Sequence, residues 1–163
     1  MAVANALYNT IQRHKIVKDV ARVVLPPTLY SKSAQYLGEA YVEYKLALRY
    51  ENEDDIQNAL YFYEQSATKG FAYAQYKLAK HYQETNDTAQ SIKWLKKAAK
   101  QNVPEAQFDL GLCYYSGDGV DIDIDRAIKL ITLAANNNYS TAKTYLLLHK
   151  SKTIMVDIIN DTI

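Results

Sequence analysis

The residues whose spacing best suits chemistry are three aspartates between two apolar segments. Asp121, Asp123 and Asp125 are arranged like the first half of a calcium-binding loop, in which alternate residues contribute oxygen ligands. Such a loop also needs glycine at its sixth position and glutamate at its twelfth, where this sequence has Arg126 and Thr132. We therefore interpret Asp123 as a helix cap and the other two as solvated residues, and we predict no metal site.

The histidines and the cysteine do not form a catalytic or metal-binding pattern. His14, His81 and His149 lie far apart, and none has a second ligand three or four residues away. Cys113 lies within a helical pattern without a nearby base, which favours a packed thiol over a nucleophile. A single cysteine allows no intrachain disulfide, and this favours a reducing compartment. We expect a cytoplasmic protein without a cofactor.

Charged residues suggest two binding surfaces, each with a simpler explanation. One face of a predicted helix carries Lys93, Lys96, Lys97 and Lys100, which suits phosphate or an acidic partner. We favour a solvated outer face, because lysines near a helix C-terminus also complement its dipole. Acidic turns with the sequences ENEDD, ETND and SGDGVDIDID suit a basic partner. Helix capping alone explains much of that acidity.

Length and composition limit the possible classes of protein. The chain has 163 residues, enough for one domain, and 48% of them are hydrophobic. Its net charge of +1 provides no global field for nucleic acid or an anionic membrane. We see neither a signal peptide nor the run of about 18 apolar residues that a membrane helix needs. With 5 Gly and 3 Pro, the composition favours helices.

A helical hairpin pattern occurs three times at a nearly constant period. The fullest copy spans residues 106–138, and the shift between copies is 32 residues, becoming 36 after the glycine-bearing loop of the last copy. Each copy places an aspartate before its second helix, as expected for an N-cap: Asp55, Asp87 and Asp123. Each copy also ends on a residue that tolerates the left-handed C′ conformation: Gly70, Asn102 and Asn138. A shared period in apolar residues and caps predicts a repeat array.

The ends of the chain depart from this pattern. Residues 2–24 predict an amphipathic helix that ends at Pro26-Pro27, and residues 28–37 predict a second helix that stops at Gly38. We assign residues 1–38 to an N-terminal capping helix and a degenerate leading repeat. Repeats then cover residues 39–150, in copies of about 40–71, 72–103 and 104–138 with a partial copy at 139–150. Residues 151–163 form a C-terminal capping segment with a short helix.

The repeated unit resembles a known family, the Sel-one-like repeats, which are relatives of the tetratricopeptide repeats. The resemblance covers about residues 40–147. In the fullest copy the matching residues are Ala106, Leu110, Gly111, Tyr114, Gly117, Gly119, Val120, Asp123, Ala127, Ala134, Ala135 and Asn138. The resemblance implies an all-α, right-handed α-solenoid of antiparallel helix-turn-helix repeats. It also implies a role in assembling protein complexes, without specifying the partner.

The 15 tyrosines give the strongest indication of a binding surface. Tyrosine combines a large apolar area with a polar tip and few rotatable bonds. The first helices of such arrays line the concave surface, so we predict that a partner binds in this groove; packing is the alternative role. The predicted groove residues are Tyr41, Tyr44, Leu48, Tyr73, Tyr76, Lys80, Phe108, Leu112 and Tyr115.

We therefore predict a non-enzymatic adaptor that binds a protein or peptide, and neither nucleic acid nor membrane. One version is a bacterial cytosolic immunity protein that neutralises a toxic effector, and another is a virulence or signalling adaptor. The competing class is an enzyme, such as a hydrolase acting on cell-wall-like substrates. No nucleophile–base pair, paired carboxylates or glycine-rich phosphate loop favours an enzyme.

We expect that removing residues 1–25 lowers the melting temperature or the solubility. Each helix pair in such an array leaves an apolar side that only a neighbouring element covers. Thermal unfolding of the truncated chain, compared with the full chain at equal concentration, measures this effect. Unchanged unfolding would exclude a capping role for the N-terminal helix.

Overall fold

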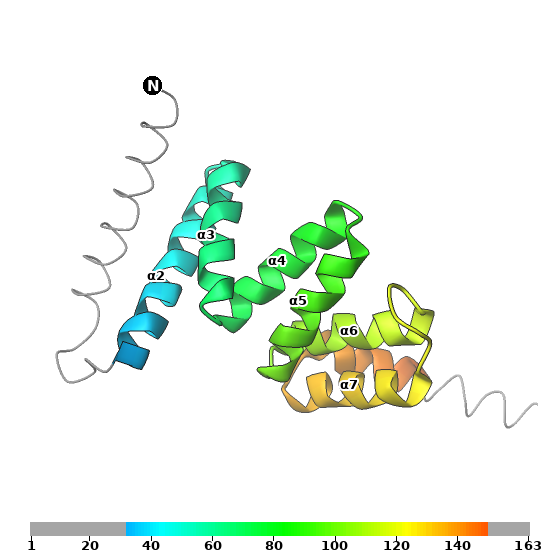
Figure 1. Ribbon diagram of the computed structural model, residues 1–163. Coiled ribbons are helices and arrows are strands. Elements are labelled where there is room, and N and C mark those ends of the chain that lie inside the picture. Colours follow the sequence, from blue (N-terminus) through cyan, green and yellow to red (C-terminus); the bar gives the residue numbers. More distant parts are fainter. Residues whose placement is uncertain (1–31, 150–163) are drawn as a thin grey trace, which may run out of the picture. The chain divides into compact units, whose positions relative to one another are not determined.

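The computed structural model describes residues 32–149, with side chains from Gly38 onward, and every regular element in that range is a helix. The elements pair in chain order (Figure 1), as the repeats predicted. The helices are α2 (Lys32–Asn52), α3 (Ile56–Thr68), α4 (Ala72–Glu84), α5 (Thr88–Lys100), α6 (Pro104–Ser116), α7 (Ile124–Asn136) and a last helix over residues 140–149. The prediction of an all-α fold built from solenoid-type helix pairs is confirmed.

The chain forms two compact units, which meet within α4 between Leu78 and Ala79. Unit 1 is Met1–Leu78 and unit 2 is Ala79–Ile163. The predicted helix over residues 2–24, its end at Pro26-Pro27 and the predicted segment 151–163 lie outside the described residues.

The predicted N-caps of the second helices are confirmed in all three repeats. The side chain of Asp55 accepts a hydrogen bond from the backbone of Asn58, and those of Asp87 and Asp123 do the same for the residue three positions on. The backbone N–H of each capping aspartate also donates to the carbonyl of the last tyrosine in the preceding helix. These three bonds are Asp55–Tyr50 at 2.9 Å, Asp87–Tyr82 at 2.8 Å and Asp123–Tyr114 at 2.9 Å.

Left-handed backbone residues occur at both ends of the second helices. The predicted C′ residues have positive φ angles: Gly70 at 96°, Asn102 at 62° and Asn138 at 65°. Two further residues, Asp54 and Asn86, have φ of 59° directly before the N-caps, which the repeat pattern did not predict. Aspartate and asparagine tolerate this conformation better than other residues with side chains. A single left-handed residue lets the short turn of repeats 1 and 2 close onto the tyrosine carbonyl.

Buried glutamines join successive repeats. Gln75 and Gln107 occupy the same repeat position, and each donates its side-chain amide to the carbonyl of a buried alanine near the end of the preceding helix. The acceptors are Ala67 at 3.1 Å and Ala99 at 3.2 Å. Because an unpaired polar group is costly in a core, these glutamines specify where each new repeat begins.

The predicted helix end at Gly38 is wrong, because α2 continues through this buried residue. Glycine inside a helix costs about 1 kcal/mol, which favourable packing readily offsets. Contacts with α3 hold this stretch in place. Ser66 donates a hydrogen bond of 2.6 Å to the carbonyl of Ala40, and Lys69 forms ion pairs with Glu39 and Glu43.

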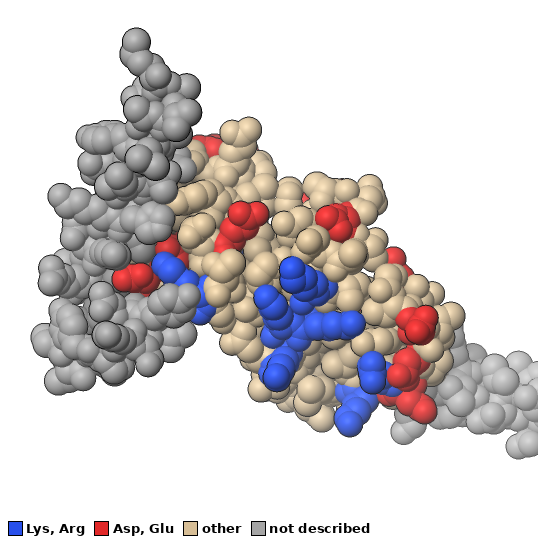
Figure 2. All heavy atoms as spheres, viewed as in Figure 1, with Lys and Arg blue, Asp and Glu red and all other residues tan. Residues whose placement is uncertain are grey.

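Charged side chains are segregated within unit 2 (Figure 2). Basic residues gather over α5, and acidic residues gather over the turn between α6 and α7. The exposed members are Lys93, Lys96, Lys97 and Lys100 on α5, Asp118 and Asp121 on the turn, and Asp125 in the first turn of α7. Charges of opposite sign therefore occupy separate parts of this unit.

Helices α6 and α7 pack tightly against each other at Gly111 of α6. A Cβ atom here would lie 2.7 Å from Cγ1 of Ile131 and 3.1 Å from the carbonyl oxygen of Ala127. In the preceding repeat the equivalent positions hold Ala79 and Leu95, which are also buried. Glycine is therefore found opposite the β-branched Ile131, and alanine is found where the opposite residue is Leu95, which has no branch at Cβ.

We expect Gly111→Ala to lower the free energy of unfolding by about 1 kcal/mol, because overpacking against the β-branched Ile131 outweighs the gain in helix propensity. Adding Ile131→Leu should restore stability, since this pair reproduces Ala79 with Leu95. Urea-induced unfolding of both variants measures the effect. A Gly111→Ala protein more stable than the parent would contradict the steric argument.

Candidate functional site

Five aromatic rings contact one another in unit 1. We call Tyr41, Tyr44, Tyr63, Phe71 and Tyr73 the aromatic cluster. The shortest ring separation is 4.9 Å, between Tyr44 and Phe71, and Tyr41 lies edge-on to Phe71 at 5.9 Å. The other pairs are separated by 6.0 to 6.5 Å, within the range that favours tilted and edge-to-face aromatic pairs.

Two of these rings remain half-exposed on the rigid cluster. Tyr41 is 43% exposed and Tyr73 is 47% exposed, whereas Tyr63 is buried. Tyr41 and Tyr44 lie one turn apart on α2, and the left-handed Gly70 reverses the chain so that Phe71 joins them. The exposed tyrosine rings therefore pack against the half-buried Phe71 and Tyr44 before any partner binds.

An ion pair connects helices next to the cluster. Lys77 of α4 lies 2.8 Å from a carboxylate oxygen of Glu51, and the hydroxyl of Tyr63 donates to the same carboxylate at 2.8 Å. The ammonium of Lys77 also lies 5.9 Å from the centre of the Tyr63 ring. This network fixes Tyr63, on which Tyr44 rests.

The network shifts the pKa of both acidic groups. Burial raises the pKa of Glu51, but the hydrogen bonds from Lys77 and Tyr63 outweigh it, so the net shift is downward. Burial, followed by the hydrogen bond to Glu51, raises the pKa of Tyr63. At neutral pH Glu51 is therefore charged and Tyr63 is a neutral donor.

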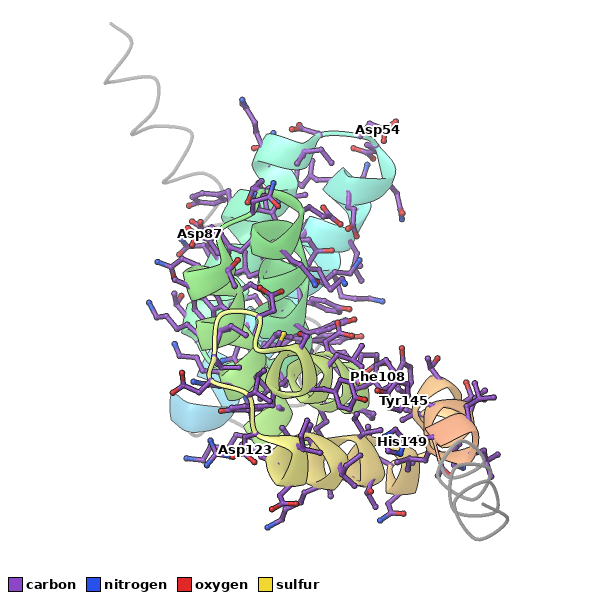
Figure 3. All side chains as sticks on the ribbon, turned by 90° about the vertical axis from the view of Figure 1, so that its right-hand side faces the viewer. Asp54, Asp87, Phe108, Asp123, Tyr145 and His149 are labelled. Atoms are coloured by element: carbon purple, nitrogen blue, oxygen red, sulfur yellow. The ribbon has the colours of Figure 1, made fainter. Side chains whose placement is uncertain are left out.

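A second group of rings lies in unit 2, around Phe108. Phe108 is only 7% exposed, because Tyr139 and Tyr145 cover it edge-on at 5.5 Å and 5.7 Å. Figure 3 shows that Tyr145 lies between Phe108 and His149. Tyr115 is 39% exposed and lies edge-on to Tyr145 at 6.5 Å. Phe108 thus supports this surface from the core, while Tyr115 is presented to solvent.

The predicted groove residues are divided between the two units. Tyr41, Tyr44 and Tyr73 contact one another in unit 1, where Leu48 and Tyr76 are half-buried. In unit 2, Leu112 packs against the core around Phe108, and Lys80 lies 3.6 Å from a carboxylate oxygen of Asp109.

Sequence reasoning missed several rings that complete these groups, including Phe71, Tyr63, Tyr139 and Tyr145. Phe71 and Tyr139 share a repeat position, directly after the left-handed C′ residue, where a hydrophobic contact with the helix end is common. This position was available as a signal in the sequence. Tyr145 carried no such signal, because the corresponding position of the preceding copy is Asp109.

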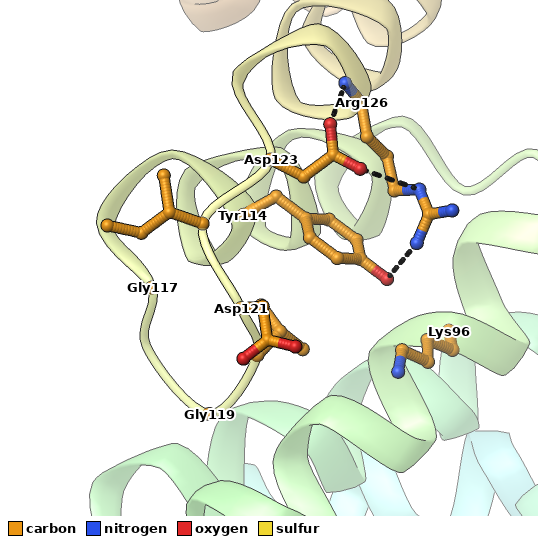
Figure 4. A pocket seen from close by; sticks show the side chains of 9 residues that line it. Lys96, Tyr114, Gly117, Gly119, Asp121, Asp123 and Arg126 are labelled. Atoms are coloured by element: carbon orange, nitrogen blue, oxygen red, sulfur yellow. Dashed lines mark hydrogen bonds and ion pairs between the residues drawn. The ribbon is translucent and has the colours of Figure 1, made fainter.

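A pocket of about 760 Å³ lies beside the loop between α6 and α7. We call it the glycine-loop pocket; it is lined by Lys96, Tyr114, Gly117, Gly119, Val120, Asp121, Ile122, Asp123 and Arg126. Arg126 lies over the ring of Tyr114, donates to its hydroxyl at 3.1 Å and lies 3.6 Å from Asp123 (Figure 4). At Gly119 a Cβ would lie 2.4 Å from Cγ2 of Thr88, so glycine lets the loop reach α5.

Two further kinds of reactive group in the described part of the chain are the thiol of Cys113 and the potential metal ligands. Cys113 is buried, as expected for a packed thiol, and burial with the nearby charge of Asp118 raises its pKa to about 11. Residues 32–149 contain no group of three or more His, Cys, Asp or Glu side chains able to hold a metal. In the same range, no helix is both long and apolar enough to span a membrane.

Fold and surface together define a helical repeat protein with exposed aromatic side chains on a rigid framework. The Sel1 repeat family model matches residues 40–71, 72–103 and 104–139. The chain belongs to the Sel1 repeat family, whose repeats are in general protein-interaction modules. No match was found among curated proteins.

Two solved structures show the same fold. The crystal structure of a Sel1 repeat protein from Oxalobacter formigenes has a TM-score of 0.64 and 27% sequence identity, covering 74% of this chain and 95% of that one. The crystal structure of c5321, a protective antigen of uropathogenic Escherichia coli strains with an SLR fold, has a TM-score of 0.65 and 31% identity. That match covers 74% of this chain and 27% of c5321.

We expect Glu51→Gln to lower the free energy of unfolding by about 0.5 kcal/mol at pH 7, because the network is partly exposed and screened by solvent. Since the pKa of Glu51 is lowered by folding, its contribution is complete above the usual glutamate range and is lost as pH falls through the folded value. The difference between parent and variant, measured by chemical denaturation, should therefore shrink as pH falls below the usual glutamate range.

The matched control is Glu53→Gln, which removes a more exposed partner of Arg49. It should change the unfolding free energy by less than Glu51→Gln at pH 7. An equal effect of the two substitutions would contradict a specific role for the Glu51 network.

Proposed function

We propose that the chain is a non-enzymatic adaptor and that unit 1 holds a peptide segment of a partner protein against the aromatic cluster. The half-exposed Tyr41 and Tyr73, braced by Phe71 and Tyr44, are the observation that carries this proposal. Such rings provide apolar area for proline or aliphatic side chains, and their hydroxyls reach backbone carbonyls. Little conformational entropy is lost on binding, because the rings are already packed.

The proposal extends to unit 2 through Tyr115, the exposed member of the second ring group. Lys80, Leu112 and Phe108 would support that contact rather than form its centre, since they are half-buried or buried. The roles of Leu48 and Tyr76 in the predicted groove stay a prediction.

More specific roles are versions of this proposal that the identity of the partner distinguishes. A toxic effector as partner would make the chain an immunity protein, and a signalling or virulence factor would make it an adaptor of that system. A hydrolase needs an activated nucleophile, and a pKa of about 11 leaves Cys113 almost entirely protonated at neutral pH. This argument supports binding of a partner protein over hydrolysis of a substrate.

We expect one stoichiometric partner to co-purify with the chain from its native source, identified by mass spectrometry. Replacing both Tyr41 and Tyr73 by alanine should weaken that complex at least about thirtyfold, the effect of losing about 2 kcal/mol at a binding hot spot. Replacing both by phenylalanine should retain most of the affinity, because the ring area is kept.

The matched control is Ile56→Ala, which removes a similarly exposed apolar side chain at the start of α3. This variant should bind like the parent, and all variants should keep the parent's melting temperature within a few degrees. A complex that survives the double alanine substitution, or a preparation that turns over a substrate without any partner, would overturn the proposal.

A further inference from the structure

The outer face of α5 is a second candidate binding surface, independent of the aromatic cluster. We call Lys93, Lys96, Lys97 and Lys100 the lysine ladder. All four are exposed, and Figure 2 shows basic side chains gathered over this helix. Their spacing extends over about 10 Å of one helix face at 1.5 Å per residue. The sequence alone favoured a simple solvated face here.

The other two repeats do not share the complete ladder. The equivalent positions in the preceding repeat hold Tyr61, Glu64, Gln65 and Thr68, and those in the following repeat hold Lys129, Thr132, Leu133 and Asn136. Like charges one turn apart repel each other and weaken a helix. The helix dipole favours Lys97 and Lys100 in the last turn, but it does not explain Lys93 and Lys96.

The ladder also lacks the counter-charges that other lysines have. Across residues 38–149, no carboxylate lies within ion-pair distance of any of the four. Lys69, Lys77 and Lys80 each form such a pair. Two of the four have other contacts: Lys97 lies 4.1 Å above the centre of the Trp94 ring, and Lys93 lies 5.9 Å from the same ring and 3.5 Å from the side-chain oxygen of Gln90. The ladder therefore presents uncompensated positive charge.

The ladder leads into the glycine-loop pocket, which Lys96 also lines. Across this pocket, the guanidinium of Arg126 is oriented by Tyr114 and Asp123 (Figure 4). A guanidinium held in this way still has N–H groups for a carboxylate. On the loop side, the exposed carboxylate of Asp121 marks the boundary of the positively charged surface.

We propose that the lysine ladder and the Arg126 side of the glycine-loop pocket bind a short acidic segment of a partner protein. A short segment fits because the positive region is bounded by Asp121 and its acidic neighbours on the loop. An extended nucleic acid or an anionic membrane would be repelled by those carboxylates, and the net charge of +1 provides no compensating field.

The test uses the full chain and a labelled short peptide that carries glutamates at the helical spacing of the ladder. Fluorescence anisotropy at low and physiological salt should show binding that weakens as salt rises. Combining Lys96→Gln and Lys100→Gln should weaken binding about five- to tenfold, as expected for two partly exposed ion pairs. The variant should fold normally, because glutamine is a good helix former at exposed positions.

The matched control combines Arg49→Gln and Lys143→Gln, which removes the same charge from other exposed positions. It should change peptide affinity by less than about twofold. Equal effects of the two variants, or no effect of either, would overturn the proposal. Tighter binding of single-stranded DNA, or of phosphatidylserine-containing vesicles, than of the peptide would also overturn it.

Discussion

The three repeats depend on one recurrent turn, in which a tyrosine carbonyl accepts the backbone N–H of the aspartate that caps the next helix. This bond occurs from Asp55 to Tyr50, from Asp87 to Tyr82 and from Asp123 to Tyr114. It joins the end of one helix to the start of the next, while the same aspartate satisfies a free N–H through its side chain. The bond is retained when four residues are added to the loop of the third repeat.

Because this turn and the buried glutamines specify the framework, positions that differ between repeats are free to acquire other roles. The aromatic cluster uses positions on α2, on α3 and around the start of α4, and the lysine ladder uses the outer face of one second helix. The added loop residues of the third repeat create the glycine-loop pocket without disturbing the helix pair. In these proposals, stability and binding depend on different residues of the same repeat.

Features carried by local sequence could be predicted, and features that depend on tertiary contacts could not. The aspartate N-caps and left-handed C′ residues follow from the chemistry of single residues at a fixed period. The end expected at Gly38 was wrong because packing of α2 on α3 outweighs a weak local preference. The burial of Phe108 depends on Tyr145, from a helix whose sequence departs from the repeat.

The net charge of +1 conceals a strongly ordered charge pattern. Lys77 forms an ion pair with Glu51, and Lys80 forms one with Asp109. Each pair joins two helices, so these charges help to position them. On the outer face of α5, the same side-chain type stands without a carboxylate neighbour in the described range, so it contributes nothing comparable to folding. Lys93 and Lys97 contact the ring of Trp94, but none of the four lysines has a carboxylate neighbour in that range, and this is the basis for proposing an anionic partner. Composition cannot reveal this difference, because it depends on where each charge lies relative to its opposite.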